Sequence, residues 1–183
     1  MAITFEKEKV KGNFPVFWRG ECGVLPGDFK LTTDLPEGTL VKKGTPIKLD
    51  FAKMECKICK AVEVINGGTT TKPRIKKGSF AVKSETVGGQ AINSIDSSNA
   101  DYDVLTLAAA AETAVAGAVL GIGEDLPDAV VETDFVFTKN MSFQTVSAGY
   151  EVLILKDVAY PMPKDWLVGY SMKNNPSIKY IRQ

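Results

Sequence analysis

The chain has 183 residues and a mass of 19.8 kDa, with 22 basic and 22 acidic side chains and no histidine. This balanced charge argues against a nucleic-acid-binding protein or a polybasic membrane-surface protein, because both depend on a net positive field. Without histidine, Ser-His-Asp and Cys-His catalytic arrangements are excluded, and a zinc site would have only cysteine and carboxylate ligands.

The first 34 residues differ from the rest of the chain. A charged start precedes the aromatic side chains of Phe14, Phe17 and Trp18, and three glycines and one proline lie between Trp18 and the end of this segment. No hydrophobic period is sustained, so we expect residues 1–34 to form an extended arm. The arm either packs along its own domain or places Phe14, Phe17 and Trp18 on a neighbouring chain, since large apolar side chains are rarely left in water.

Residues 35–183 are expected to form a mainly β domain, a sandwich or a barrel-like fold of short antiparallel strands with one or two short helices. Short apolar or alternating segments are separated there by turns that contain glycine and proline. No apolar run is long enough for a membrane span or a signal peptide, so we expect no membrane insertion. The pattern leaves open whether these residues form one domain or two small β subdomains. Strands are expected at 46–49, within 51–65, after residue 78, at 91–95, 102–107, 131–137, 152–155 and 178–181.

Three of these segments carry specific expectations. Residues 91–95 and 102–107 flank a polar cluster typical of a hairpin turn. In 131–137 the polarity alternates, so Val131, Thr133, Phe135 and Phe137 should share one face of a strand. The uninterrupted apolar run 152–155 is typical of a strand buried on both faces.

Two other segments favour helical turns. The alanine-rich stretch 108–116 is expected to form a short helix or a tight turn, because alanine favours helix but no large apolar side chain anchors it. Prolines 161 and 163 precede a segment that is expected to form one or two helical turns.

A short phrase recurs along the chain. Lys42-Lys43-Gly44 returns as Lys76-Lys77-Gly78, and looser echoes contain Gly117 and Gly149. Each glycine is expected in a turn that begins a strand, and the lysines are expected at exposed strand edges. Because the intervening spacings do not match, we interpret the copies as recurrent turns and not as an internal duplication.

The pair Cys56 and Cys59 is the one motif that could carry chemistry by itself. It supplies two metal ligands or a redox pair, but a structural zinc site needs four donors, and the third cysteine, Cys22, is distant in sequence. In an extended strand the two thiols would point to opposite faces, so we expect them to fill the interior as small apolar groups.

Acidic residues show no calcium-binding spacing, and we interpret them as solvated turn carboxylates. The sequence therefore predicts no catalytic, cofactor-binding or metal site, and no enzyme. The acidic residues weighed as calcium ligands are Asp96, Asp101, Asp103, Glu124, Asp125 and Asp128.

The segments 72–78 and 91–107, the glycine turns near 117 and 149, and the proline-rich tail around Trp166 resemble the head fibre proteins of tailed bacteriophages and prophages. The resemblance covers about residues 35–183 and rests on pattern and phrase order. It implies a β-rich virion protein, made in the bacterial cytoplasm and attached to the capsid exterior. It further implies self-association into homotrimers, binding to the major capsid protein, no cofactor and no catalysis.

A second function is a β-sandwich module that recognises a host surface glycan or a host protein through its loops. This function needs aromatic side chains gathered on one loop face. The candidates are Tyr150, Tyr160 and Trp166.

Overall fold

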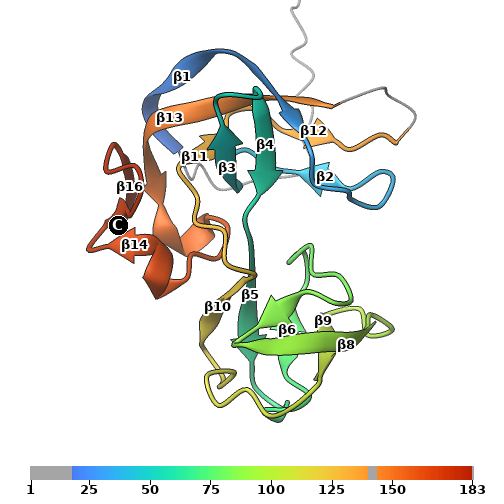
Figure 1. The fold of residues 1–183 in the computed structure, drawn as a ribbon. Helices are drawn as coiled ribbons and strands as arrows, with labels where there is room; N and C mark the ends of the chain where they lie inside the picture. Colours follow the sequence, from blue (N-terminus) through green and yellow to red (C-terminus); the bar gives the residue numbers. More distant parts are fainter. Residues whose placement is uncertain (1–17, 140–143, 183) are drawn as a thin grey trace, which may run out of the picture.

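The computed structural model describes residues 18–139 and 144–182 (Figure 1). They form a mainly β structure, as expected, with two lobes. We name residues 60–122 the barrel lobe, and residues 18–59 with 123–182 the large lobe. The chain enters the barrel lobe where β4 leads into β5 and leaves it after β10 (Figure 1). No helix in the described ranges is long and apolar enough to cross a membrane.

The large lobe is built on one eight-stranded sheet, in the order β1-β4-β3-β11-β13-β16-β15-β14. Strand β1 also pairs with β13, so β1, β4, β3, β11 and β13 close into a ring. β2 and β12 form a separate two-stranded sheet. The strands of this lobe are β1 (Trp18–Leu31), β2 (Leu40–Val41), β3 (Pro46–Asp50), β4 (Glu55–Ile58), β11 (Ala129–Val131), β12 (Phe135–Val136), β13 (Thr145–Leu155), β14 (Leu167–Val168), β15 (Ser171–Met172) and β16 (Ile178–Ile181).

The barrel lobe is a closed antiparallel barrel in the order β10-β5-β6-β9-β8-β7. Its interior is filled by buried aliphatic side chains such as Val62, Ile75, Ile92 and Leu105. Closure of the barrel pairs backbone N–H and C=O groups at strand edges that would otherwise be open to other chains. The strands are β5 (Lys60–Ile65), β6 (Arg74–Lys76), β7 (Thr86–Val87), β8 (Gln90–Asp96), β9 (Tyr102–Leu107) and β10 (Val119–Ile122).

Apolar burial is divided among three clusters. One lies within the large lobe and includes Phe29, Ile47 and Val146. A second includes Trp166 and Tyr180 from the C-terminal part of the chain. The third fills the barrel. Each cluster removes aliphatic and aromatic surface from water, which is the main favourable contribution to folding.

The sequence analysis missed β1. Residues 18–31, which we expected in the arm, pair with β13 over most of their length. Gly20 and Gly27 have φ angles of 76° and 86°, and the register against β13 shifts at three places. These irregularities hide the strand period in the sequence. Phe14 and Phe17, with the rest of 1–17, lie outside the described residues.

Several other expectations are confirmed. β8 and β9 form the antiparallel hairpin around the polar turn, and β16 is the expected terminal strand. Helical structure in the described ranges is limited to two 3-10 turns, η1 (Lys156–Val158) and η2 (Lys164–Trp166). The alanine-rich stretch 108–116 forms turns, and Ala111 and Ala114 pack into the barrel core.

Three strand expectations are wrong. No strand follows Gly78 directly, because residues 79–85 form turns and irregular structure and the next strand, β7, begins only at Thr86. Val152–Leu155 is not buried on both faces, because Leu153 is 41% exposed while its neighbours Val152 and Ile154 are buried. This part of β13 therefore packs one face on a core and turns the other face outward. Residues 131–137 do not form one strand, because β11 ends at Val131 and β12 begins at Phe135, where the chain pairs with β2 instead.

Candidate binding cleft

A cleft of about 610 Å³ opens where the barrel lobe meets the large lobe. Most of its wall comes from the turn at 42–45, the turn at 76–80, and the segment 156–162 with Arg182. Leu40 of β2, Glu63 of β5 and Val119 of β10 complete the lining. This volume lies within the range of small-molecule binding sites. The cleft is therefore large enough for a ligand of several rings.

Both copies of the Lys-Lys-Gly phrase line this cleft, one from each lobe. Gly44 and Gly78 have φ angles of 81° and 86°, which confirms that each phrase forms a turn. Among the described lining residues, Glu63 is the one carboxylate. The cationic lining residues are Lys42, Lys43, Lys76, Lys77, Lys156 and Arg182.

Ion pairs orient the two barrel-lobe lysines. Lys76 Nζ lies 3.1 Å from Glu63 Oε2, and Lys77 Nζ lies 2.5 Å from Asp103 Oδ1. Lys77 Nζ also donates a hydrogen bond to Ser97 O at 3.2 Å. These partners orient both ammonium groups, and each ammonium group retains an N–H donor for a further acceptor.

Of the two large-lobe lysines, Lys43 lies beside Trp18. The Nζ of Lys43 is 5.8 Å from the centre of the Trp18 ring, a cation–π distance. The backbone N–H of Lys43 donates to Asp134 Oδ1 at 2.6 Å. Trp18, which we expected as a contact residue of the arm, is half-buried against the second core cluster. Its contact with Lys43 places it next to the cleft.

Two stacked aromatic rings form part of the wall. The rings of Phe80 and Tyr160 are 6.0 Å apart and nearly parallel, at 7°. Phe80 has a φ of 58°, a left-handed conformation that is costly for a residue with a side chain. The Tyr160 hydroxyl accepts a hydrogen bond from Ala61 N at 3.0 Å and lies within donating distance of Ser79 O, at 3.1 Å. The hydroxyl therefore connects the C-terminal segment to the barrel lobe.

Two tyrosines offer a matched test of this hydroxyl. Tyr160→Phe should lower the free energy of unfolding by about 1–2 kcal/mol, because it leaves the Ala61 N–H without its partner. Tyr180→Phe should raise it by up to about 1 kcal/mol, because the buried Tyr180 hydroxyl has no hydrogen-bond partner in the described structure. Urea unfolding of both variants measures the two changes, and equal signs would contradict this assignment.

Burial also affects the acidity of both phenols. It raises the pKa of Tyr160 and of Tyr180 above the ordinary range. Neither phenol is therefore a source of protons near neutral pH.

The three cysteines have no reactive environment. Cys56 packs in the first core cluster and Cys59 in the second, so the two thiols point to different cores, as the spacing predicts. Burial raises the pKa of Cys22 to about 11 and that of Cys56 to about 12, and it also raises the pKa of Cys59. Because the thiolate is the reactive form, the raised pKa values disfavour nucleophilic chemistry at these thiols near neutral pH.

The acidic residues considered as calcium ligands have separate roles. Asp125 pairs with Lys48 at 2.7 Å, and Asp103 pairs with Lys77. Asp128 Oδ1 accepts from Leu49 N at 3.0 Å, and burial raises the pKa of its carboxyl. Among the residues that the structure describes, no three histidine, cysteine or acidic side chains are placed to hold one metal ion.

The aromatic residues considered for glycan recognition do not converge. Tyr160 lines the cleft, but Trp166 is 4% exposed in the core, and Tyr150 lies on β13 outside the lining. Sequence reasoning also missed Phe80, which no motif distinguished. The recurrence of the Lys-Lys-Gly phrase was the available signal for the cleft, although we interpreted its lysines as exposed edges.

No protein-family model matches this chain, and neither a curated protein nor a solved structure matches it.

Proposed function

We propose that the protein is a structural virion protein, a phage head fibre or capsid decoration protein that forms homotrimers and attaches to the capsid exterior. The resemblance to head fibre proteins supports this proposal, and two of its segments, 72–78 and 91–107, form β6, β8, β9 and adjoining turns of the barrel lobe. The buried thiols also favour a structural role over a catalytic one.

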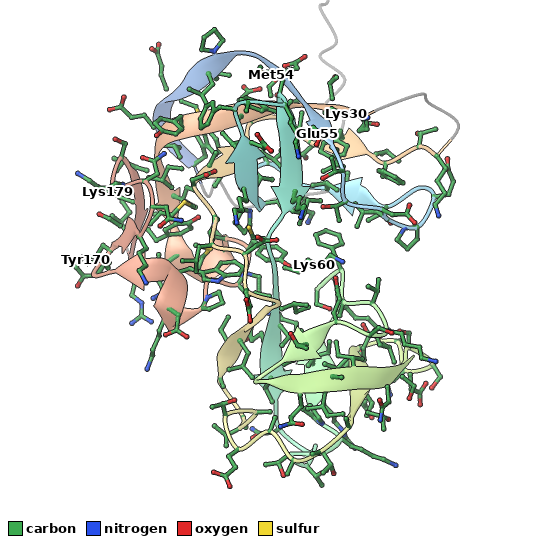
Figure 2. All side chains as sticks on the ribbon, viewed as in Figure 1. Lys30, Met54, Glu55, Lys60, Tyr170 and Lys179 are labelled. Atoms are coloured by element: carbon green, nitrogen blue, oxygen red, sulfur yellow. The ribbon has the colours of Figure 1, made fainter. Side chains whose placement is uncertain are left out.

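The observation that carries the proposal is the placement of exposed apolar side chains on two turns. Phe51 and Met54, on the turn between β3 and β4, are 56% and 41% exposed. Val168 and Tyr170, at the turn between β14 and β15, are 66% and 70% exposed. Figure 2 shows Met54 and Tyr170 at well-separated positions. A decoration protein needs two such contacts, one with its own copies and one with the shell.

We assign self-association to the turn between β14 and β15. Strand β14 ends the order of the large sheet, so none of the described strands pairs with its outer edge. This edge is therefore available to a strand of another chain. We assign capsid binding to the turn with Phe51 and Met54. An edge strand next to exposed Val168 and Tyr170 combines main-chain and apolar contacts, which is what stable subunit interfaces use.

Light scattering of the full chain should give the mass of three copies. The double variant Val168→Lys with Tyr170→Lys should be monomeric, because it places charges in the interface. The matched variant Phe51→Lys with Met54→Lys should remain trimeric but no longer co-sediment with shells of the major capsid protein from the same genome. A full-length chain that stays monomeric at all concentrations would contradict the proposal.

A further inference from the structure

We propose that residues 12–17 dock into the cleft of their own chain, with Phe14 and Phe17 against its apolar wall. This inference goes beyond the proposed structural role, because the contact needs neither a shell nor another copy of the chain. It rests on the exposed apolar side chains of the cleft, on an open edge of strand β2, and on the place where the described structure begins.

The wall of the cleft contains exposed apolar side chains. Leu40 and Val158 line it and are 44% and 40% exposed. The stacked rings of Phe80 and Tyr160 belong to the same lining and are half-buried. Apolar side chains that share a concave surface commonly mark a contact with another segment or molecule. An apolar occupant would remove this surface from water.

Most of the charged side chains of the cleft already have partners. Glu63 pairs with Lys76, and Asp103 pairs with Lys77. Three further cationic lining residues also have interactions within the chain: Lys42, Lys43 and Arg182. An occupant of this cleft therefore does not need to carry charge, and the exposed carbon surface is what it would cover.

Strand β2 offers an open main-chain edge at this wall. Among the described strands, β2 pairs only with β12. Thr39 O accepts a hydrogen bond from Phe137 N at 2.9 Å, so the main chain of the next residue, Leu40, faces away from β12. The N–H and C=O groups of Leu40 can therefore pair with an extended segment, as in the addition of a strand to a sheet edge.

The chain directly before Trp18 can reach this site. The Nζ of Lys43, in the cleft wall, lies 5.8 Å from the centre of the Trp18 ring. Residues 12–17 precede Trp18 without a linker, and six extended residues span about 20 Å. Docking within one chain also costs less entropy than capture of a segment from a second copy, because the segment is already tethered beside the cleft.

The composition of residues 12–17 matches the cleft. The sequence Gly-Asn-Phe-Pro-Val-Phe has no charged side chain, and Phe14, Val16 and Phe17 supply apolar surface. Pro15 favours an extended backbone at Phe14, and proline is tolerated in a strand that lies at an edge. The segment can therefore combine main-chain pairing at β2 with apolar contacts in the cleft.

Photo-crosslinking of the full chain tests the contact directly. The crosslinking amino acid p-benzoylphenylalanine replaces Phe14, and ¹⁵N-labelled and unlabelled chains are mixed in urea and refolded together before irradiation. Mass spectrometry should find crosslinks from position 14 to the lining segments 40–45, 76–80 or 156–162, always within chains of one isotope. The same probe in place of Val115, which is exposed on the barrel lobe outside the lining, should give none of these crosslinks.

Amide hydrogen exchange measured by NMR tests the strand addition with matched variants. In the full chain the Leu40 N–H should exchange slowly, because residues 12–17 cover it. Phe14→Ser with Phe17→Ser should speed this exchange by about tenfold or more, because the apolar contacts that hold the segment are lost. Phe5→Ser with Val10→Ser makes the same kind of change outside the segment and should alter the rate by no more than about twofold. Circular dichroism verifies that both variants keep the fold.

Four results would overturn the proposal. They are the absence of crosslinks from position 14 to the lining segments, crosslinks that join labelled to unlabelled chains, rapid exchange of the Leu40 N–H in the full chain, and equal exchange rates in the two variants. The second result would assign the cleft to the arm of another copy. None of them depends on trimer formation or capsid attachment, so the structural proposal stands or fails separately.

Discussion

Replacing Lys60 with alanine should lower the free energy of unfolding by about 3 kcal/mol, one of the two largest effects that we expect of a single substitution in this chain. The Nζ of Lys60 lies 2.7 Å from Glu85 Oε1, and the Lys60 side chain is only 8% exposed. Removing it leaves the Glu85 carboxylate, which is 28% exposed, without its cation. Urea unfolding followed by circular dichroism measures the loss.

The position of Lys60 explains the size of this effect. It begins β5, where the chain passes from the large lobe to the barrel lobe (Figure 2). Residues 58–62 are all buried, so the ammonium group has little access to water. The other oxygen of Glu85 accepts a hydrogen bond from Val82 N at 2.9 Å. The ion pair therefore also orders the loop 82–85 ahead of β7.

The surface pair Lys48 and Asp125 is the matched control. Its atoms are also 2.7 Å apart, but the two side chains are 47% and 43% exposed. Lys48→Ala should therefore cost no more than about 1 kcal/mol. Lys60→Met retains the apolar stem, so it separates the loss of charge from the loss of packing. Equal, small losses in Lys60→Ala and Lys48→Ala would show that burial does not strengthen the inner pair.

Much of the barrel lobe could be predicted because its signals are local. The polar turn between 91–95 and 102–107 predicted the β8–β9 hairpin, and Gly78 of the second Lys-Lys-Gly phrase predicted a turn. Turn chemistry and strand periodicity depend on neighbouring residues, which the sequence displays directly. That the barrel closes depends on β7 reaching β10, a pairing between distant residues that no local pattern encodes.

The large lobe was harder to predict because its features depend on contacts distant in sequence. β1 is interrupted by glycines and bulges, and it becomes recognisable as a strand only when β13 lies beside it. The cleft has the same origin, because Lys42 and Lys76 line it together only after the lobes pack. Phe80 reaches its wall through a backbone conformation that propensity disfavours. Local patterns therefore indicate the turns, whereas the site arises from how the lobes meet.

Gly149 shows how a glycine can be misinterpreted from sequence alone. We expected a turn, but Gly149 lies within β13, where it pairs with Val24 of β1 and Val130 of β11. A Cβ atom at this position would lie 2.8 Å from Cys22 Sγ and 3.3 Å from Trp18 Cη2. Glycine is needed here because side chains of neighbouring strands occupy the space, not because of its backbone freedom.

Gly149→Ala should therefore lower the free energy of unfolding by about 2–3 kcal/mol, because the methyl group overpacks a closed ring of strands. Adding Cys22→Ala removes the closest atom and should recover about 1 kcal/mol in a double-mutant cycle. Gly121→Ala is the control, since its nearest neighbour, Trp166 Nε1, is 3.3 Å away and its cost should be smaller. If Cys22→Ala restores no stability to Gly149→Ala, the contact with Val130 at 3.2 Å accounts for the lost free energy of unfolding. The closed ring of strands then resists the added methyl group by itself.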